Sequence, residues 1–96
     1  MGEKRVTVDF RINGRFMGEE IQDSDDKRTI FFSVGGETPV DRVDLIKNGR
    51  GVVFFRNAPR KVFFDYTRER EEDWYYLRIR LKDGRYAWTS PIWVKQ

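Results

Sequence analysis

The side chains that could do chemistry in this sequence are carboxylates, arginines, lysines, tyrosines and hydroxyl residues. Its 96 residues include no histidine and no cysteine. Histidine is the commonest general base and metal ligand in proteins, and a cysteine thiolate is a common nucleophile. No catalytic motif stands in their place, so we expect no enzymatic activity from this chain alone, no cofactor and no metal ion.

Acidic residues gather in two loops that would share one end of an antiparallel sheet protein. Carboxylates that converge from two loops can hold Ca²⁺, but the spacing matches no EF-hand, and basic residues lie nearby in the sequence. A solvated acidic end is the commoner explanation of such a cluster. The residues concerned are Asp23, Asp25, Asp26, Glu69, Glu71, Glu72 and Asp73.

Basic residues gather in loops that we expect at the opposite end. Such a cluster suits a phosphate group or an acidic partner, although no glycine-rich phosphate motif is present. Ordinary loop solubility would explain the same residues. This candidate anion site consists of Arg15, Arg56, Arg60, Lys61, Lys82 and Arg85.

The C-terminal hairpin offers a third candidate on its outward face, where alternate positions are occupied by Tyr76, Arg78, Arg80 and Lys82. Basic residues beside an aromatic ring suit single-stranded nucleic acid. They also suit a solvated face whose arginine stems cover apolar neighbours. Because the net charge is only +3 and the RNA-recognition strand signature is absent, we expect at most weak binding of nucleic acid.

Alternation of apolar and polar residues predicts β-strands along the whole chain, and no segment shows helical periodicity. Turn signals at Asn13-Gly14, Asn48-Gly49 and Asp83-Gly84 separate them, and Pro91 kinks or edges the last strand. The expected strands cover 4–12, 15–22, 28–34, 42–47, 52–56, 61–67 and the two arms of the C-terminal hairpin. The sequence therefore predicts an all-β fold, a single antiparallel immunoglobulin-like β-sandwich of seven or eight strands spanning residues 1–96.

Two-residue turns fix the expected registers of two hairpins. The turn at Asn48-Gly49 would pair Leu45 with Val52 and Val43 with Phe54, and the turn at Asp83-Gly84 would pair Leu81 with Tyr86 and Ile79 with Trp88. The predicted core is then Val6, Val8, Phe10, Ile30, Phe32, Val34, Val43, Leu45, Phe54, Phe64, Leu77, Ile79 and Trp88.

Several apolar residues fall on the opposite side from the core residues beside them. Exposed apolar side chains in that number indicate an interface, either with another domain or protein chain or with a second copy of this one. A β-bulge that resets the phase of a strand is the alternative explanation. The interface residues are Phe31, Val53, Phe55, Phe63, Tyr76 and Trp93, with Phe55 and Trp93 central.

The composition adds expectations about the protein's surroundings. Charged residues make up 36% of the chain, with two methionines and no cysteine, a balance that leans towards a thermophilic source. No apolar run approaches the ~20 residues that span a bilayer, and the polar N-terminus does not resemble a signal peptide. We therefore expect a cytoplasmic protein with no membrane contact.

Two segments, which lie roughly between residues 30 and 94, resemble a known domain type. The first runs from Phe32-Ser33-Val34-Gly35-Gly36 to Asn48-Gly49, and the second contains Tyr75-Tyr76-Leu77-Arg78-Ile79 and Ala87-Trp88-Thr89-Ser90-Pro91-Ile92-Trp93-Val94. They look like the C-terminal β-sandwich tail of metallohydrolases of the PHP (polymerase and histidinol phosphatase) type. The metal-binding histidines of that family lie in its catalytic domain, so the resemblance implies an accessory or interaction module and carries over no catalytic residue.

The strand spacing also resembles fibronectin-type and immunoglobulin-like modules. In such folds a tyrosine early in the penultimate strand ties a corner of the sandwich, and Tyr75 is the candidate here. A module that binds an anion, a carbohydrate or single-stranded nucleic acid remains the alternative function.

Overall fold

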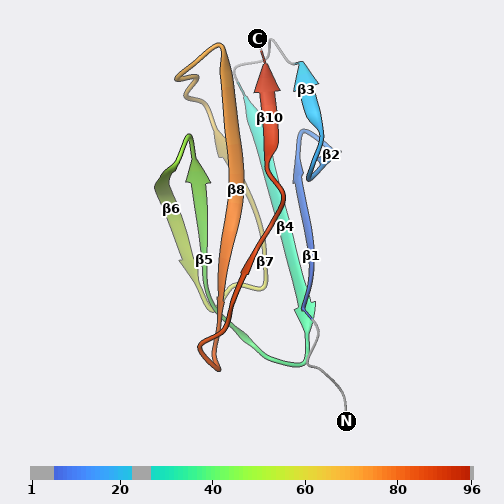
Figure 1. Ribbon diagram of the computed structural model, residues 1–96, viewed down its shortest axis with the longest axis vertical. Coiled ribbons are helices and arrows are strands. Elements are labelled where there is room, and N and C mark those ends of the chain that lie inside the picture. Colours follow the sequence, from blue (N-terminus) through green and yellow to red (C-terminus); the bar gives the residue numbers. More distant parts are fainter. Residues whose placement is uncertain (1–5, 23–26, 96) are drawn as a thin grey trace.

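The computed structural model describes residues 6–22 and 27–95, and within these ranges it contains strands and no helix (Figure 1). Accordingly, this part of the chain offers no helix that could cross a membrane. The ten strands are β1 Val6–Ile12, β2 Arg15–Phe16, β3 Glu20–Gln22, β4 Arg28–Gly36, β5 Val40–Lys47, β6 Arg50–Arg56, β7 Arg60–Asp65, β8 Glu72–Leu81, β9 Tyr86–Trp88 and β10 Ile92–Lys95.

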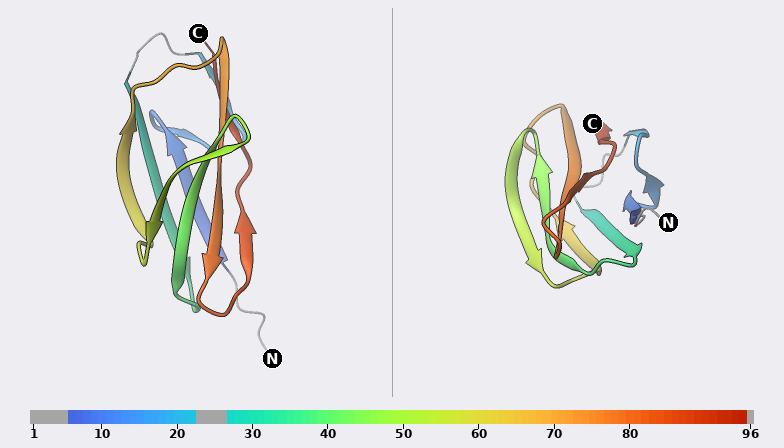
Figure 2. Two further views of the ribbon diagram at one scale, coloured as in Figure 1. Left: turned by 90° about the vertical axis from the view of Figure 1, so that its left-hand side faces the viewer. Right: turned by 60° about the horizontal axis from the view of Figure 1, so that its bottom comes forward.

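The strands form two sheets that pack face to face (Figure 2). The four-stranded sheet has the order β2-β1-β4-β7, and the six-stranded sheet has the order β3-β10-β8-β5-β6, with β9 also paired to β8. The strand pairs are antiparallel except for β3 with β10, which is parallel. The predicted all-β sandwich is confirmed.

The core lies between the sheets because their inner faces alternate as the sequence pattern predicts. Along β8, buried residues alternate with more exposed ones, and Phe10, Ile30, Phe32 and Val43 have no exposed surface. Burial of each such side chain contributes about 1.5–3 kcal/mol. The buried apolar cluster comprises Phe10, Ile12, Ile21, Ile30, Phe32, Val40, Val43, Leu45, Tyr75, Leu77, Ile79, Leu81, Ile92 and Val94, and Val6, Val8 and Val34 pack against it.

The β5–β6 hairpin differs from the predicted register. Its turn is as expected, since Asn48 and Gly49 have φ angles of 52° and 86° and Lys47 pairs with Arg50. A β-bulge beyond Ile46 then shifts the register, so that Leu45 pairs with Val53 and not with Val52. A one-residue shift moves every later side chain to the other face. The assignment of Phe54 to the core was therefore wrong, and Val53 and Phe55 point inward instead.

The register of the C-terminal hairpin also differs from the prediction, for a related reason. Its loop is one residue longer than predicted, because the Leu81 amide donates to the Arg85 carbonyl (2.8 Å) and the loop between them is Lys82-Asp83-Gly84. Ile79 consequently pairs with Ala87, and Trp88 pairs with Arg78. Trp88 is thus 61% exposed on the outer face, contrary to the predicted core.

The side chains of β7 also point to the opposite faces from those predicted. Phe63 pairs with the buried Ile30, so it points between the sheets, whereas Phe64 pairs with Thr29 and is 47% exposed. Phe63 completes an inner aromatic cluster, with ring centroids 4.9 Å from Phe55 and 6.3 Å from Phe32. The phase was misassigned because β6 and β7 each present apolar side chains on both faces.

The segment between β1 and β4 changes sheets and does not form one strand. Strand β2 pairs with β1, the Gly18 amide donates to the Pro91 carbonyl (2.8 Å), and β3 then runs parallel to β10. The Asn13-Gly14 turn lies beside Thr29, at the far end of β1 from Gly36. Arg15 is therefore at the opposite end from the loops with which we had grouped it.

Candidate functional site

Two groups of polar and aromatic side chains stand out, one inside the sandwich and one on its outer surface. The inner group, which we call the polar corner, lies where the loop from β7 to β8 crosses between the sheets. Its members are Arg28, Lys47, Asp65, Asp73 and Tyr75. Arg28 and Lys47 are each 2% exposed, and Asp73 and Tyr75 have no exposed surface.

Hydrogen bonds connect the members of the polar corner. The Arg28 guanidinium donates to Asp73 Oδ2 (2.6 Å) and to the Tyr75 hydroxyl oxygen (2.7 Å), and that hydroxyl donates to Asp65 Oδ2 (2.6 Å). The Lys47 ammonium donates to Asp65 Oδ2 (2.8 Å) and to the Thr67 carbonyl. Tyr75 thus ties the corner, as the resemblance to fibronectin-type modules implied, but through a carboxylate.

The pKa values in the corner favour the protonation states that these bonds require. Burial raises the pKa of Tyr75 far above its usual range, and the hydrogen bond to Asp65 adds to this effect. Burial alone would raise the pKa of Asp65, but hydrogen bonds from Lys47 and Tyr75 outweigh it and lower that pKa. For Asp73 the bonds from Asn48 and Arg28 outweigh burial in the same way, so its pKa is also lowered. The corner therefore holds two carboxylates, two cations and a neutral phenol.

The acidic loop that contains Glu69, Glu71, Glu72 and Asp73 belongs to this same end of the molecule. Asp23, Asp25 and Asp26 lie outside the described residues. Glu69 bonds to Arg50 (2.7 Å) and Asn48 (3.1 Å), and Glu72 lies 3.5 Å from the Lys95 ammonium. Among residues 6–22 and 27–95 no group of three or more acidic side chains is arranged to hold a metal ion. Glu69, Glu72 and Asp73 each lie beside a cation of the chain itself.

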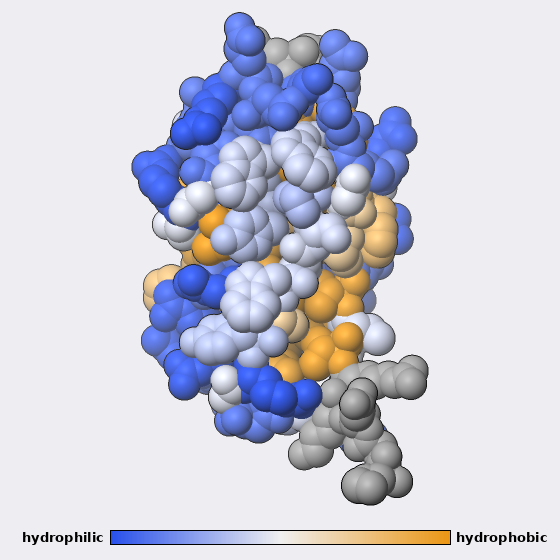
Figure 3. All heavy atoms as spheres, viewed as in Figure 1, coloured by the Kyte–Doolittle hydropathy of each residue, from blue (hydrophilic) through white to orange (hydrophobic). Residues whose placement is uncertain are grey.

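The outer group covers the solvent side of the six-stranded sheet, and we call it the aromatic–arginine face. All three tryptophans of the chain lie on it. In Figure 3, pale bulky side chains run down the middle of this side of the molecule, with charged side chains around them. Its members are Trp74, Tyr76, Arg78 and Arg80 of β8, Tyr86 and Trp88 of β9, Trp93 of β10, Arg42 and Asp44 of β5, and Phe54 and Arg56 of β6.

Strand register brings these side chains into rows across the sheet. Trp93 pairs with Trp74, and Trp88 pairs with Arg78, which in turn pairs with Asp44. Neighbouring rings along one strand are stacked: the centroids are 5.8 Å apart for Trp74 with Tyr76, and also 5.8 Å for Tyr86 with Trp88. These four aromatic residues thus form two stacked pairs on one face of the sheet.

The arginines of the face are held against rings and carboxylates. The Arg42 guanidinium carbon lies 4.0 Å from the centroid of the Phe54 ring, a cation–π distance, and its Nε donates to Asp44 Oδ1 (2.7 Å). Arg78 also donates to Asp44 (3.1 Å), and Arg80 lies 3.8 Å from Asp41. With Arg56, which lies over the Phe54 ring, four guanidinium groups accompany these two carboxylates, so this surface carries a net positive charge.

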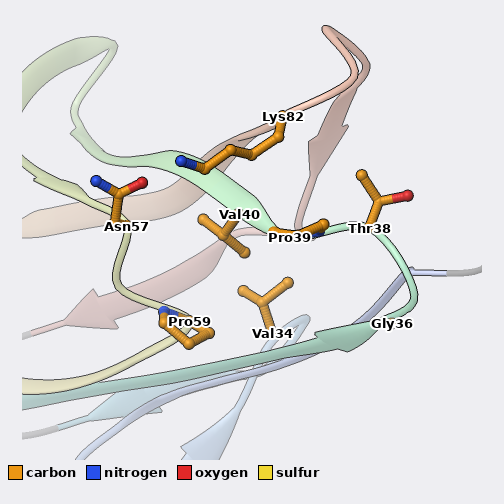
Figure 4. Close-up of a pocket in the computed structure, with 8 residues that line it drawn as sticks. All are labelled: Val34, Gly36, Thr38, Pro39, Val40, Asn57, Pro59 and Lys82. Atoms are coloured by element: carbon orange, nitrogen blue, oxygen red, sulfur yellow. The ribbon is translucent and has the colours of Figure 1, made fainter.

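A cavity of about 410 Å³ opens at the end opposite the polar corner. Figure 4 shows Lys82 above it, with its amine directed to the side where Asn57 lies, and Val34, Val40 and Pro59 around it. Of the six residues in the predicted anion site, Lys82 alone lines this cavity. The cavity therefore presents a single cation and a largely apolar wall.

The other residues of the predicted anion site are turned to separate neighbours. Arg85 bonds to Asp83 (2.8 Å) and Thr38 (3.1 Å). Ring contacts hold three more: Arg56 lies over Phe54, Arg60 over Phe31 and Lys61 over Phe55. With Arg15 at the other end, the structure does not gather these cations at one point, and an anion site there remains only a prediction.

The predicted interface residues divide into two sets. Tyr76, Trp93 and Phe31 point outward, since each alternates with buried neighbours. Val53, Phe55 and Phe63 are partly buried and pack against the core, so the bulge was the correct explanation for β6. The exposed apolar residues that sequence reasoning missed are Phe16, Val52, Phe54, Val62, Phe64, Tyr66, Tyr86 and Trp88.

This chain is similar to part of a longer protein and to solved structures with a similar fold. No family model matches the chain. An uncharacterized protein of Chlamydia muridarum (strain MoPn / Nigg) is 26% identical over 110 residues, which cover 95% of this chain and 18% of that protein. This chain therefore corresponds to less than a fifth of the relative's length.

Two solved structures have similar folds. The fibronectin(III)-like modules of Clostridium thermocellum CbhA match with a TM-score of 0.64 and 21% identity, over 93% of this chain and 96% of that one. A crystal structure of an engineered protein matches with a TM-score of 0.57 and 15% identity, over 98% of this chain and 20% of that one. Together with the strand order and the Tyr75 corner, these matches show that the chain has a fibronectin type III-like β-sandwich fold.

Proposed function

We propose that this chain is a non-catalytic accessory module that docks onto an acidic surface of a neighbouring domain through its aromatic–arginine face. The observation that carries the proposal is Trp88, whose side chain is 61% exposed beside Tyr86 at 48%. Tryptophan, tyrosine and arginine are the residue types that contribute most to binding at protein interfaces. Their concentration on one sheet face favours recognition of a partner over simple solubility.

The acidic character of the partner follows from charge. Arg42, Arg78 and Arg80 contact two carboxylates, Arg56 lies over the Phe54 ring, and Asp44 is itself only 6% exposed. An acidic surface would be complementary to this excess of guanidinium groups. Aromatic rings between the arginines would supply the apolar area that such an interface needs.

The neighbouring-domain part of the proposal rests on the comparisons. Matched regions make up 18% of the Chlamydia protein and 20% of the engineered chain, so folds of this kind occur within longer polypeptides. The resemblance to the tail of PHP-type metallohydrolases names a specific partner, a histidine-rich catalytic domain. Under that proposal the catalytic residues belong to the other domain, and this chain supplies a docking surface.

Hydroxyl-radical footprinting tests the proposal in two samples, the isolated chain and the product of the full reading frame. We expect Trp88 and Tyr86 to react readily in the isolated chain and to be protected in the full product. Phe16, which is 41% exposed on β2, serves as the control and should react equally in both. Equal reactivity of Trp88 in the two samples would contradict docking through this face, and a reading frame without a further domain would contradict the accessory role.

Single-stranded nucleic acid is a second candidate ligand for the same face, because stacked ring pairs beside guanidinium groups suit bases and phosphates. A folded acidic domain is preferred because Asp41 and Asp44 already offset part of the arginine charge, and the whole chain carries only +3. Titration of the isolated chain with a single-stranded oligonucleotide separates the two proposals. Submicromolar affinity at physiological salt, lost in Trp88→Ala, would favour the nucleic acid.

A further inference from the structure

A second apolar surface lies away from the aromatic–arginine face, along the free edge of β7. Val62 is 53% exposed and Phe64 is 47% exposed, and Tyr66, directly after the strand, is 64% exposed. A groove of about 390 Å³, lined by Val53, Phe55, Phe63 and Phe64 among others, runs beside this edge. Exposed apolar edge strands pair readily with other strands.

The backbone of β7 is prepared for such pairing. The Val34 amide donates to the Pro59 carbonyl (2.7 Å), and the register continues with Lys61 opposite Phe32 and Phe63 opposite Ile30. Because hydrogen-bonded pairs alternate along an antiparallel ladder, the odd-numbered residues of β7 bond to β4. The amide and carbonyl groups of Arg60, Val62 and Phe64 therefore point to the free edge.

The sequence of β7 is polarised in a way that suits an antiparallel copy of itself. It begins with Arg60 and Lys61 and ends with Asp65, whose carboxylate stays bonded to Lys47, so two antiparallel copies keep their basic starts at opposite ends of the pair. Another edge strand, β6, has Arg50 at its start and Arg56 at its end. Two antiparallel copies of β6 would oppose arginines, so charge favours β7 over β6 as the strand that pairs.

We propose that two copies of this chain associate through their β7 strands, which pair antiparallel about a two-fold axis at Phe63 and join the two four-stranded sheets. In this register Val62 of one copy pairs with Phe64 of the other, through the amide and carbonyl groups that point away from β4. Lys61 then lies opposite Asp65, and Arg60 lies opposite the ring of Tyr66. This proposal is independent of the proposed function, which concerns the other sheet.

Sedimentation velocity of the 96-residue chain tests the association. We expect the average mass to rise from monomer towards dimer as the concentration increases from micromolar upward. Phe64→Lys should keep the protein monomeric, because it places two cations in the paired edge. Phe54→Lys is the matched control on β6, at 49% exposure, and should leave the dimer intact. A monomer throughout, or a dimer that persists in Phe64→Lys, would overturn the proposal.

Engineered cysteines test the register, and the chain is suited to this because it has no cysteine of its own. A mixture of Val62→Cys and Phe64→Cys proteins should form a mixed disulfide on mild oxidation, while each alone should form much less. Efficient cross-linking of Val62→Cys with itself would mean a different register and would overturn the pairing stated above. Both variants change exposed residues, so near-ultraviolet circular dichroism should show an unchanged fold.

Discussion

The polar corner and the aromatic–arginine face use the same chemistry in two settings. In the corner, Arg28 contacts the Tyr75 hydroxyl and the Asp73 carboxylate, and all three side chains are at most 2% exposed. On the face, Arg42 contacts the Phe54 ring and the Asp44 carboxylate, and the Arg42 and Phe54 side chains are 35% and 49% exposed. The difference in exposure separates a group that holds the fold from one that is available to a partner.

The loop between β7 and β8 closes the polar corner off from solvent. The backbone amides of Glu69 and Arg70 donate to the Asp73 carboxylate (3.3 and 3.0 Å), and the Lys47 ammonium bonds to the Thr67 carbonyl in the same loop. Within the described residues no comparable loop covers the outer face of the six-stranded sheet. Desolvation makes every contact in the corner consequential for stability, whereas solvent weakens the contacts of the face.

The largest expected effect comes from breaking the corner. Arg28→Ala leaves the buried Asp73 carboxylate without its cation, and we expect it to lower the free energy of unfolding by about 3–5 kcal/mol. Arg42→Ala is the matched change on the face, and its solvent-screened contacts should be worth about 1 kcal/mol or less. Urea denaturation of both variants measures the two values. Equal losses would remove the distinction between the regions.

Truncation of a core side chain should lower the free energy of unfolding nearly as much as Arg28→Ala does. Leu77→Ala removes a side chain with no exposed surface from β8, two residues after Tyr75. We expect it to lower the free energy of unfolding by about 2–5 kcal/mol. Tyr76→Ala, one position along on the face, should cost less because that side chain is only half-buried. A loss below about 1 kcal/mol for Leu77→Ala would contradict its placement at the centre of the core.

Acid should weaken the polar corner. The pKa values of Asp65 and Asp73 are lowered in the folded protein, so the unfolded chain takes up protons at a higher pH than the folded one. Their contribution to stability is therefore present above about pH 4, the ordinary carboxyl pKa, and is lost as the pH falls through the lower folded values. The free energy of unfolding should decrease less steeply with falling pH in Asp73→Asn, which is less stable at neutral pH. An equally steep fall in this variant would assign the acid sensitivity to other carboxylates.

Alkali should act on the corner through Tyr75. Its pKa is raised by burial and by the bond to Asp65, so the unfolded chain loses this proton first. The stability due to the neutral phenol is present below about pH 10, the ordinary tyrosine pKa, and is lost as the pH rises further. Tyr75→Phe should be less stable at neutral pH by about 1–3 kcal/mol and should lose less of its remaining stability at high pH. Thermal melts at neutral and alkaline pH compare the two proteins.

The same contrast explains which parts of the structure the sequence could predict. Alternation assigned β1, β4, β5 and β8 correctly, because each strand has one consistently apolar side that faces the core. It failed on β6 and β7, where Val52-Val53-Phe54-Phe55 and Val62-Phe63-Phe64 are apolar on both sides. There the phase depends on a bulge and on pairing with a distant strand, which a local pattern does not encode.

The candidate site was only partly predictable for the same reason. Tyr76, Arg78, Arg80 and Trp93 were placed on an outer surface by simple alternation, and Trp74 belongs to the same alternating series. Tyr86 and Trp88 were missed because one extra residue in the loop at Asp83-Gly84 reverses their side. The polar corner joins residues up to 47 positions apart, and among its members only Tyr75 had a recognisable signal.

The smallest expected effect concerns nucleic acid on the face. Four arginines lie there, but Asp41 and Asp44 offset part of their charge, and the whole chain carries only +3. Because phosphate binding is driven by the release of counterions, a single-stranded oligonucleotide should bind weakly and should be released as salt increases. Fluorescence titration at two salt concentrations measures this, since all three tryptophans lie on the face. Arg80→Ala should weaken the binding further, whereas Arg15→Ala, which alters a residue at the far end of β1, should not. Tight binding that salt does not diminish would show that the aromatic rings, and not the guanidinium groups, dominate recognition. The aromatic–arginine face would then be less similar to the polar corner than its residue types suggest.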